Sequence, residues 1–307
     1  AHIHMEAKAV TIVSPDGRRY NIARDETQGF IIDRVAYVAS LAQEAREAGA
    51  EFDLGQRVTS IAVADDGVTV LASGAGGHTS HRARLLIIAS GFGSPLLGMV
   101  GLRGNGNQPH MVGSQAEVIA NDLEDTEVYL GQAIAPGSFG WLVPAAGSRA
   151  LVGLVSRQEL NGHMDRFIST LQQDGKVGEI VKQPKRWGIP LKPLGRTYGD
   201  RVLVAGDAAG MAKPTTGGGI YYALLSGELA AETAGEALAA DDLSARQLRA
   251  YEKRWKALFG KEMRIGYMAR MLFESLRDSQ LDRLLDTLVS CESRDGIISG
   301  EFSFDWH

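Results

Sequence analysis

Apolar residues in this chain fall into short runs separated by glycine-rich turns, and only a few stretches carry helical spacing. Two runs, residues 84–89 and 201–205, are nearly continuously aliphatic, as strands buried on both faces of a sheet are. Elsewhere apolar and polar residues alternate, which is typical of half-buried antiparallel strands. The pattern therefore predicts a fold that combines α-helices with both kinds of strand.

The first hundred residues predict a hairpin, a helix and several strands. The Ser-Pro-Asp-Gly turn at residues 14–17 separates two short alternating runs, which indicates a β-hairpin. Asp33 can cap a helix whose apolar positions repeat at three and four, and Gly49 can end it. The expected ranges are 9–13 and 19–22 for the hairpin, 34–48 for the helix, and 51–54, 58–63, 68–71 and 84–89 for further strands, with an Asp-Asp-Gly turn at 65–67.

From about residue 112 the pattern of apolar and polar residues changes to short alternating strands and, later, to helices. Over residues 112–193 we expect an antiparallel sheet with helical cover, with strands at 127–134, 139–143, 150–155 and 185–189 and a helix near 164–173. Residues 221–238, rich in Ala, Leu and Glu, predict a helix. Residues 244–289 predict two or three amphipathic helices with clustered methionines and end before a loose tail at 301–307. A lid packed on the core is our favoured interpretation of these helices, and contact with a membrane surface is the alternative.

Composition narrows the class of protein. With 307 residues, 44% of them apolar, the chain can bury one large core or two smaller ones. A net charge of −5, with both signs interspersed, argues against nucleic acid as a partner. No apolar run reaches the ~20 residues of a membrane span and no signal peptide is seen, so we expect a cytoplasmic protein, with peripheral membrane contact as the alternative.

The cysteine and histidine residues predict neither a disulfide nor a metal site. The single cysteine, Cys291, cannot form an internal disulfide, fits a reducing compartment and is interpreted as a bystander thiol. The seven histidines show no metal-ligand spacing, so no metal site is expected.

One segment, residues 206–220, carries more information than any other. It reads Gly-Asp-Ala-Ala-Gly-Met-Ala-Lys-Pro-Thr-Thr-Gly-Gly-Gly-Ile and joins a buried strand to a helix. Unpaired N–H groups and the dipole at a helix N-terminus attract an anionic or electron-rich group, and glycines let a ring approach closely. Asp207 can accept hydrogen bonds from hydroxyls. We interpret the segment as a site for a large cofactor; the alternative is a tight turn whose glycines only pack helix on strand.

The stretch from Gly199 to Glu228 resembles the second flavin fingerprint of the FAD-dependent geranylgeranyl reductase family, within the larger group related to p-hydroxybenzoate hydroxylase. The resemblance extends over residues 10–276 approximately. It implies FAD as cofactor, with Asp207 at the ribityl chain and the amides around Gly219 and Ile220 at the pyrimidine end of the isoalloxazine ring. The cofactor-binding residues it implies in this segment are Gly206, Asp207, Pro214, Gly217, Gly218, Gly219 and Ile220.

The resemblance implies two further cofactor contacts. Arg34, in the first turn of the helix after Asp33, would lie near the pyrophosphate, which a guanidinium fork suits. Val58 would offer its backbone to the adenine. Without the family, Arg34 is equally well interpreted as a surface arginine.

Residues 136–144, Pro-Gly-Ser-Phe-Gly-Trp-Leu-Val-Pro, resemble the family's Pro-x-x-Tyr-x-Trp-x-Phe-Pro box, which lines an isoprenoid tunnel. Phe139 replaces the tyrosine and Val143 the phenylalanine, so the wall stays apolar but loses a hydroxyl. Because alternate residues of a strand share a face, Phe139, Trp141 and Val143 form one apolar stripe. The implied substrate-binding residues are Phe139, Trp141, Val143 and Pro144; ordinary core packing is the alternative.

The sequence departs from the family at its start. A strand, a Gly-x-Gly-x-x-Gly turn and a helix are expected there, and residues 1–33 contain no such pattern. The Gly-Asn-Gly-Asn turn at 104–107 follows no strand and is rejected as a substitute. The adenylate half of the FAD site is thus missing from this chain, and three explanations stay open: an N-terminal piece is absent, it lies on another chain, or it has been lost.

The resemblance implies a Rossmann-like FAD domain interleaved with an antiparallel-sheet substrate domain, an α/β (α+β) arrangement that ends in a helical region. The expected segments are a substrate-domain hairpin at 1–32, FAD-domain segments at 33–100 and 196–240, the substrate domain at 101–195 and the C-terminal helices at 241–307.

The function implied is a flavin-dependent reductase that saturates carbon–carbon double bonds of a polyprenyl (geranylgeranyl-type) lipid. No residue stands out as proton donor, so no catalytic acid is named, and NADPH and a ferredoxin-like protein both stay open as electron donor. One alternative is a flavin monooxygenase of the same superfamily. The other is a non-autonomous binding or electron-transfer subunit with a degenerate FAD site.

Overall fold

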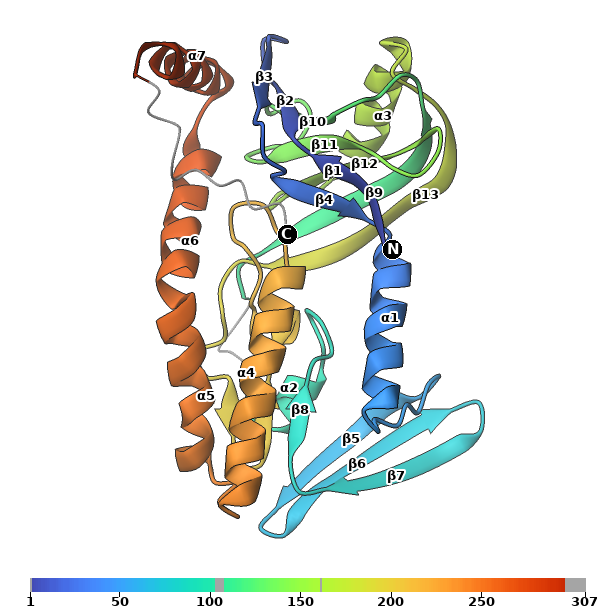
Figure 1. Ribbon diagram of the computed structural model, residues 1–307, viewed down its shortest axis with the longest axis vertical. Coiled ribbons are helices and arrows are strands. Elements are labelled where there is room, and N and C mark those ends of the chain that lie inside the picture. Colours follow the sequence, from blue (N-terminus) through green and yellow to red (C-terminus); the bar gives the residue numbers. More distant parts are fainter. Residues whose placement is uncertain (1, 103–107, 161, 296–307) are drawn as a thin grey trace. The chain divides into compact units, whose positions relative to one another are not determined.

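The computed structural model describes residues 2–102, 108–160 and 162–295 (Figure 1). The chain divides into two compact units. Unit 1 takes residues 1–44, 111–188 and 270–307, and unit 2 takes residues 45–110 and 189–269. Helices α1 (Arg34–Glu47) and α6 (Gly260–Ser275) each begin in one unit and end in the other.

A seven-stranded sheet forms the body of unit 1, with strand order β13-β9-β12-β11-β10-β2-β3. Helix α3 (His163–Gln173) covers one face, and its buried residues Met164, Phe167, Ile168 and Leu171 recur at helical spacing. They form one core with the inward side chains of β10, β11 and β12. The strands are β2 (Ala9–Val13), β3 (Arg19–Ala23), β9 (His110–Ala120), β10 (Thr126–Leu130), β11 (Phe139–Pro144), β12 (Arg149–Ser156) and β13 (Val177–Pro190), and a separate pair joins β1 (Ile3–Ala7) to β4 (Gly29–Ile32).

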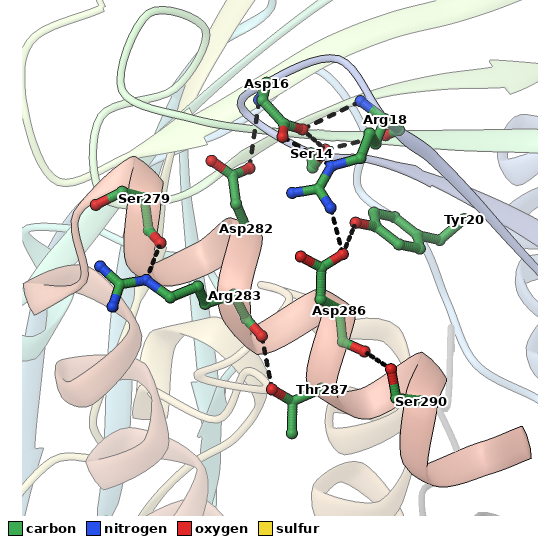
Figure 2. A network of polar contacts seen from close by, with 10 residues as sticks. All are labelled: Ser14, Asp16, Arg18, Tyr20, Ser279, Asp282, Arg283, Asp286, Thr287 and Ser290. Carbon is green, nitrogen blue, oxygen red and sulfur yellow. Dashed lines mark hydrogen bonds and ion pairs between the residues drawn. The ribbon is translucent and has the colours of Figure 1, made fainter. Parts of the chain in front are cut away.

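Helix α7 (Asp278–Asp295) is tied to the β2–β3 hairpin by polar contacts (Figure 2). Asp286 accepts hydrogen bonds from the Arg18 guanidinium and, at 2.8 Å, from the Tyr20 hydroxyl. Asp282 accepts the backbone N–H of Asp16 at 3.3 Å. The hydrogen bond from Arg18 is the main reason that the pKa of Asp286 lies below its usual value.

Unit 2 contains two three-stranded sheets. One is the meander β5 (Arg57–Ala64), β6 (Gly67–Gly74) and β7 (Gly77–Ala83); the other has the order β14-β15-β8. Helices α4 (Ile220–Ala239) and α5 (Ala245–Leu258) pack beside each other, and α5 packs on β15, where the Tyr251 hydroxyl donates to the Val204 carbonyl at 2.8 Å. The remaining elements are β8 (Leu86–Ile88), β14 (Tyr198–Gly199), β15 (Val202–Val204), the short α2 (Leu96–Met99) and the 3₁₀ turn η1 (Gly206–Ala209).

The expected mixture of helices and both kinds of strand is confirmed, as are most single elements. The Asp33 carboxylate accepts the N–H groups of Val35 and Ala36 at 3.0 Å, which is the predicted cap of α1. Gly49 follows with a φ of 94°. The hairpins at 9–23 and 57–74, strands β11, β12 and β15, and helices α3, α4 and α5–α7 are also found where the pattern predicted them.

Several expectations are wrong. Residues 51–54 form no strand: they lie in the irregular connection between α1 and β5, where Phe52 and Leu54 are exposed. The strand expected at 127–134 ends at Leu130, where a left-handed Gly131 turns the chain. The run 84–89 holds the shorter β8, and Ile87 is exposed, so β8 is not buried on both faces. Strands β1, β4, β7 and β9 were not expected.

Two helices also bury less than their patterns suggested. In α1, Val35 is 81% and Val38 56% exposed, although their spacing predicted a core-facing stripe. In α6, Met263 is buried, but Met268 is 70% exposed, so this helix buries only part of its apolar surface. The segments 104–107 and 301–307 lie outside the described residues, as does the side chain of Cys291.

Candidate functional site

The Gly-Asp segment begins at the exit of strand β15 in unit 2. β15 is buried and runs parallel to β8, with Val202 opposite Leu86 and Val204 opposite Ile88. The chain leaves it through Gly206, which has a φ of 61° and donates its N–H to the Ser226 Oγ at 2.9 Å. A Cβ atom at Gly206 would lie 3.3 Å from the Cβ of Ala223. Gly206 therefore brings the strand exit and α4 together, which is also a packing role.

Other residues of the segment fix its own path. A Cβ atom at Gly210 would lie 2.2 Å from the Lys192 carbonyl oxygen, so only glycine fits there. The Lys213 N–H donates to the Gly218 carbonyl and the Gly217 N–H donates to the Lys213 carbonyl, both at 2.8 Å, which closes the loop. Pro214 is buried against Gly266 of α6. These contacts fix the path of the loop.

Asp207 and Gly219 lie side by side where α4 begins. A Cβ atom at Gly219 would lie 2.6 Å from the Asp207 Oδ1, so this carboxylate rests on the backbone of the helix start. Gly219 occupies the N-cap position, and no side chain caps the helix. Residues 217–220 are all partly exposed. An exposed helix N-terminus beside a carboxylate and lined by glycines fits an electron-rich ring that carries hydroxyls.

The other two expected cofactor residues lie elsewhere. Val58 is on β5, half-buried against the core of unit 2, and the pairing of β5 with β6 is interrupted by a bulge directly after it. Arg34 is the exposed first residue of α1 and belongs to unit 1. The structure thus brings together the residues of the 206–220 segment, which all belong to unit 2. Arg34 belongs to unit 1 and is not part of that group.

The aromatic stripe lies on the face of the unit 1 sheet opposite to α3. Leu142 and Gly140 of β11 point into the core formed with α3, so Phe139, Trp141 and Val143 point to the other side. The rings of Phe139 and Trp141 are 6.0 Å apart between centroids. The Trp141 indole N–H donates to the Gln115 Oε1 at 3.2 Å. Packing beneath α3 therefore does not explain the stripe. Pro144, the last residue of β11, is buried, and the same alternation puts it on the side of Leu142 and not in the stripe.

Glycines on neighbouring strands form the floor of this face. Gly153 pairs with Trp141, and a Cβ atom there would lie 2.2 Å from the indole Cζ2. Gly113, two positions from the partner of Gly153, holds a second indole in the same way, with Trp187 of β13 2.6 Å from its Cβ position. Trp187 and Gln115 were not expected from the sequence; small residues paired opposite tryptophans are the signal that could have found them. We name this surface, formed by Phe139, Trp141, Val143, Gly153, Gly113 and Trp187, the aromatic face.

Comparison with known proteins defines the class first. Residues 6–180, more than half of the chain, match the model of the FAD dependent oxidoreductase family, so the chain belongs to that family. Within it, the chain is 32% identical over 302 residues to the digeranylgeranylglycerophospholipid reductase of Methanocaldococcus jannaschii, covering 94% of this chain and 76% of the relative. A second such reductase, from Methanopyrus kandleri, is 30% identical and covers 93% and 75%.

The solved structures agree with this placement. A geranylgeranyl bacteriochlorophyll reductase-like protein from Thermoplasma acidophilum superposes with a TM-score of 0.84 at 26% identity, covering 93% of this chain and 75% of that one. The p-nitrophenol 4-monooxygenase PnpA from Pseudomonas putida, at a TM-score of 0.69 and 16% identity, shares the fold alone. The expected family, geranylgeranyl reductases of the FAD-dependent oxidoreductases, and the α/β fold class are therefore confirmed.

Proposed function

We propose that this protein is a flavin-dependent reductase that saturates carbon–carbon double bonds of a polyprenyl lipid of the geranylgeranyl type. The observation that carries the proposal is the aromatic face, an apolar surface with a glycine floor on the side of the sheet away from α3. Relatives named digeranylgeranylglycerophospholipid reductases support a polyprenyl glycerophospholipid as substrate.

Residues 206–220 would hold the flavin. Asp207 would accept hydrogen bonds from the ribityl hydroxyls, and the N–H groups at Gly219 and Ile220 would face the pyrimidine end of the ring, where the α4 dipole favours negative charge. Gly217, Gly218 and the buried Pro214 would shape the loop around it. Arg34 and the backbone of Val58 are proposed for the pyrophosphate and the adenine.

A reduced flavin held by residues 206–220 would supply the hydride for the reduction. The protein's own contribution is positioning, because an isolated alkene accepts hydride poorly and reacts only when held in a dry, oriented pose. Phe139, Trp141 and Val143 offer apolar surface without a hydroxyl that would hold water. The bond between Trp141 and Gln115 satisfies the only polar atom of the indole and fixes its plane.

We assign the proposed binding roles to the segments that were expected from the sequence. Residues 1–32 and 101–195 would serve substrate binding, residues 33–100 and 196–240 cofactor binding, and residues 241–307 would form a helical region beside them. Two electron donors stay open, a reduced nicotinamide and a ferredoxin-like protein. An assay that compares the rate of flavin reduction with each donor would distinguish them.

We also propose a peripheral contact of α6 with a lipid surface. Ile265, Met268 and Leu272 recur along its outward side and are 56%, 70% and 66% exposed. Lys261 and Arg264 are exposed at the start of the same side, which suits anionic headgroups. In the described part of the chain, none of the helices has the length and apolar character needed to cross a membrane.

The test begins with a visible absorption spectrum of the purified chain before and after FAD is added. Flavin bands that stay with the protein after gel filtration are expected. The loaded protein is then reduced without oxygen and given a geranylgeranyl glycerophospholipid, and the product is weighed by mass spectrometry. A gain of one H₂ per double bond supports the proposal. A hydroxylated product formed only with oxygen would indicate a monooxygenase instead, and failure to bind excess FAD would contradict the cofactor assignment.

A further inference from the structure

A buried arginine lies next to the turn that leads into the aromatic face. Arg270 of α6 is only 2% exposed and is among the largest fully buried side chains of the described chain. A buried guanidinium is costly unless it is paired and hydrogen-bonded, so its partners show what it is for. No sequence motif pointed to Arg270, and it belongs neither to the 206–220 segment nor to the aromatic face.

Two of the contacts of Arg270 are with a carboxylate and with a backbone carbonyl. Its Nε donates to the Glu274 Oε1 at 2.7 Å, and its Nη2 donates to the Gly137 carbonyl at 3.2 Å. Glu274 also accepts from the Arg157 Nη1 at 3.1 Å. Burial is the main cause that lowers the pKa of Arg270, and the contact with Glu274 opposes that shift. Glu274 therefore pairs with two cations, and of these two Arg270 also donates to the backbone of the turn.

The turn itself is built to be held from two sides. Gly137 has a φ of 65°, and its Cβ position lies 3.5 Å from the Glu274 side chain. On the other side, the Ser156 Oγ donates to the Pro136 carbonyl at 2.7 Å. Two residues after Gly137 comes Phe139, the first member of the aromatic face, whose ring contacts Trp141. A shift of the Gly137 peptide would be transmitted to both rings.

We propose that Arg270 is a positioning residue: by holding the Gly137 carbonyl it sets the pose of Phe139 and Trp141, and with it the affinity for the polyprenyl chain. This inference rests on the proposed function, because it assigns the aromatic face to that chain. It differs from a simple tether between α6 and the sheet, since Arg157 tethers the same carboxylate without touching the turn.

The matched variants are Arg270→Met, Arg270→Lys and Arg157→Met. Glu274 keeps at least one cation in each of them, so this partly buried carboxylate is never left without a partner. The protein is labelled with 5-fluorotryptophan, and the ¹⁹F resonance of Trp141 among the four tryptophans is assigned with Trp141→Phe. Geranylgeraniol is the probe for binding, and a FAD titration reports on the flavin segment.

With Arg270→Met, the Trp141 resonance should shift without ligand and geranylgeraniol should bind about tenfold more weakly, while FAD affinity stays unchanged. For Arg270→Lys, the resonance position and the geranylgeraniol affinity should lie between those of the wild type and those of Arg270→Met. For Arg157→Met, both should match the wild type. An unmoved Trp141 resonance, or equal effects from Arg157→Met and Arg270→Lys, would overturn the inference. If Arg270→Met does not fold, the comparison of Arg270→Lys with Arg157→Met decides.

Failure of the proposed function gives a different pattern. If geranylgeraniol leaves the Trp141 resonance of the wild type unchanged, the assignment of the aromatic face to a polyprenyl chain fails. The shift of that resonance in the Arg270 variants without ligand still shows whether Arg270 positions the two rings.

Discussion

At the scale of single residues, missing Cβ atoms explain more of the candidate sites than charged side chains do. Gly219 accommodates the Asp207 carboxylate, Gly153 accommodates the Trp141 ring, and Gly113 accommodates Trp187. In each case an alanine would place its Cβ closer than 3.0 Å to a group of the proposed site. The glycine triplet at 217–219 could be recognised because its members are consecutive in the sequence. Gly153 and Gly113 could not, because the tryptophans that they accommodate lie on neighbouring strands whose pairing the sequence does not specify.

Gly219→Ala should weaken FAD binding with little loss of stability. The φ of Gly219 is −112°, which alanine adopts freely, but the new Cβ would lie 2.6 Å from the Asp207 Oδ1 and displace the carboxylate. We expect at least a tenfold weaker FAD affinity, about 1.4 kcal/mol, in a titration followed by flavin fluorescence.

The control for this substitution is Gly227→Ala, also in α4, where a Cβ would meet nothing within 4 Å. It should leave FAD affinity unchanged and stabilise the helix by about 0.5–1 kcal/mol. Equal FAD affinities for both variants would refute the placement of the ribityl chain at Asp207.

Glu127 should give unit 1 an acid-sensitive stability. This buried carboxylate of β10 is hydrogen-bonded by Arg19, by Lys176 and by the Tyr129 hydroxyl. Burial alone would raise its pKa, but the hydrogen bonds from Arg19 and Lys176 hold the pKa below its usual value of 4.5. Its stabilising contribution is therefore complete above the unfolded-state pKa and is lost as the pH falls through the lower folded-state pKa.

Urea unfolding midpoints measured at pH values from about 6 to about 3 test this expectation. The midpoint of the wild type should fall over that range more steeply than that of Glu127→Gln, which lacks the titrating group. If the midpoints of the two proteins fall in parallel as the pH is lowered, Glu127 contributes nothing to the loss of stability in acid.

At the scale of elements, local signals predicted boundaries better than burial. The Asp33 cap and Gly49 stop of α1 could be predicted because they act within one turn. The exposure of Val35 could not, because it depends on what packs against the helix. Strand β7, Gly-His-Thr-Ser-His-Arg-Ala, was missed because it is largely exposed and has no alternation, so only its pairing with β6 makes it a strand.

Helix α6 has apolar residues on two sides, and its outward side should bind lipid surfaces. Met263 and Gly266 pack inward, whereas Ile265, Met268 and Leu272 are exposed. Co-sedimentation with phosphatidylglycerol vesicles should be strong for the wild type and largely lost for Met268→Ser combined with Leu272→Ser. Lys261→Gln and Arg264→Gln should each weaken binding about fivefold, corresponding to about 1 kcal/mol per charge.

The matched control is Val63→Ser, an exposed apolar residue of β5 at 39% exposure. It should bind vesicles as the wild type does. If the wild type does not co-sediment with anionic vesicles at low salt, or if Val63→Ser loses binding equally, the α6 surface has no specific part in membrane contact.

At the scale of the whole molecule, composition allowed one large core or two smaller ones, and the residues that the structure describes form two. One comprises buried residues of unit 2 alone, including Trp255, and the other comprises buried residues of unit 1 alone. The chain passes between the units after residues 44, 110, 188 and 269. This interleaving could not be predicted locally, because it depends on pairings such as that of Val10 with Thr126, which no sequence pattern specifies.

Two cores in one chain should give two unfolding transitions that FAD separates. Variants that keep Trp255 or Trp141 as the only tryptophan report on unit 2 and unit 1 respectively. FAD at one hundred times its Kd should stabilise the transition seen by Trp255 by about 2.7 kcal/mol, because residues 206–220 belong to that unit. Any smaller shift seen by Trp141 should vanish with Arg34→Gln, since Arg34 is the proposed cofactor residue in unit 1. Coincident transitions that FAD shifts equally, with or without Arg34, would mean that the two cores unfold as one.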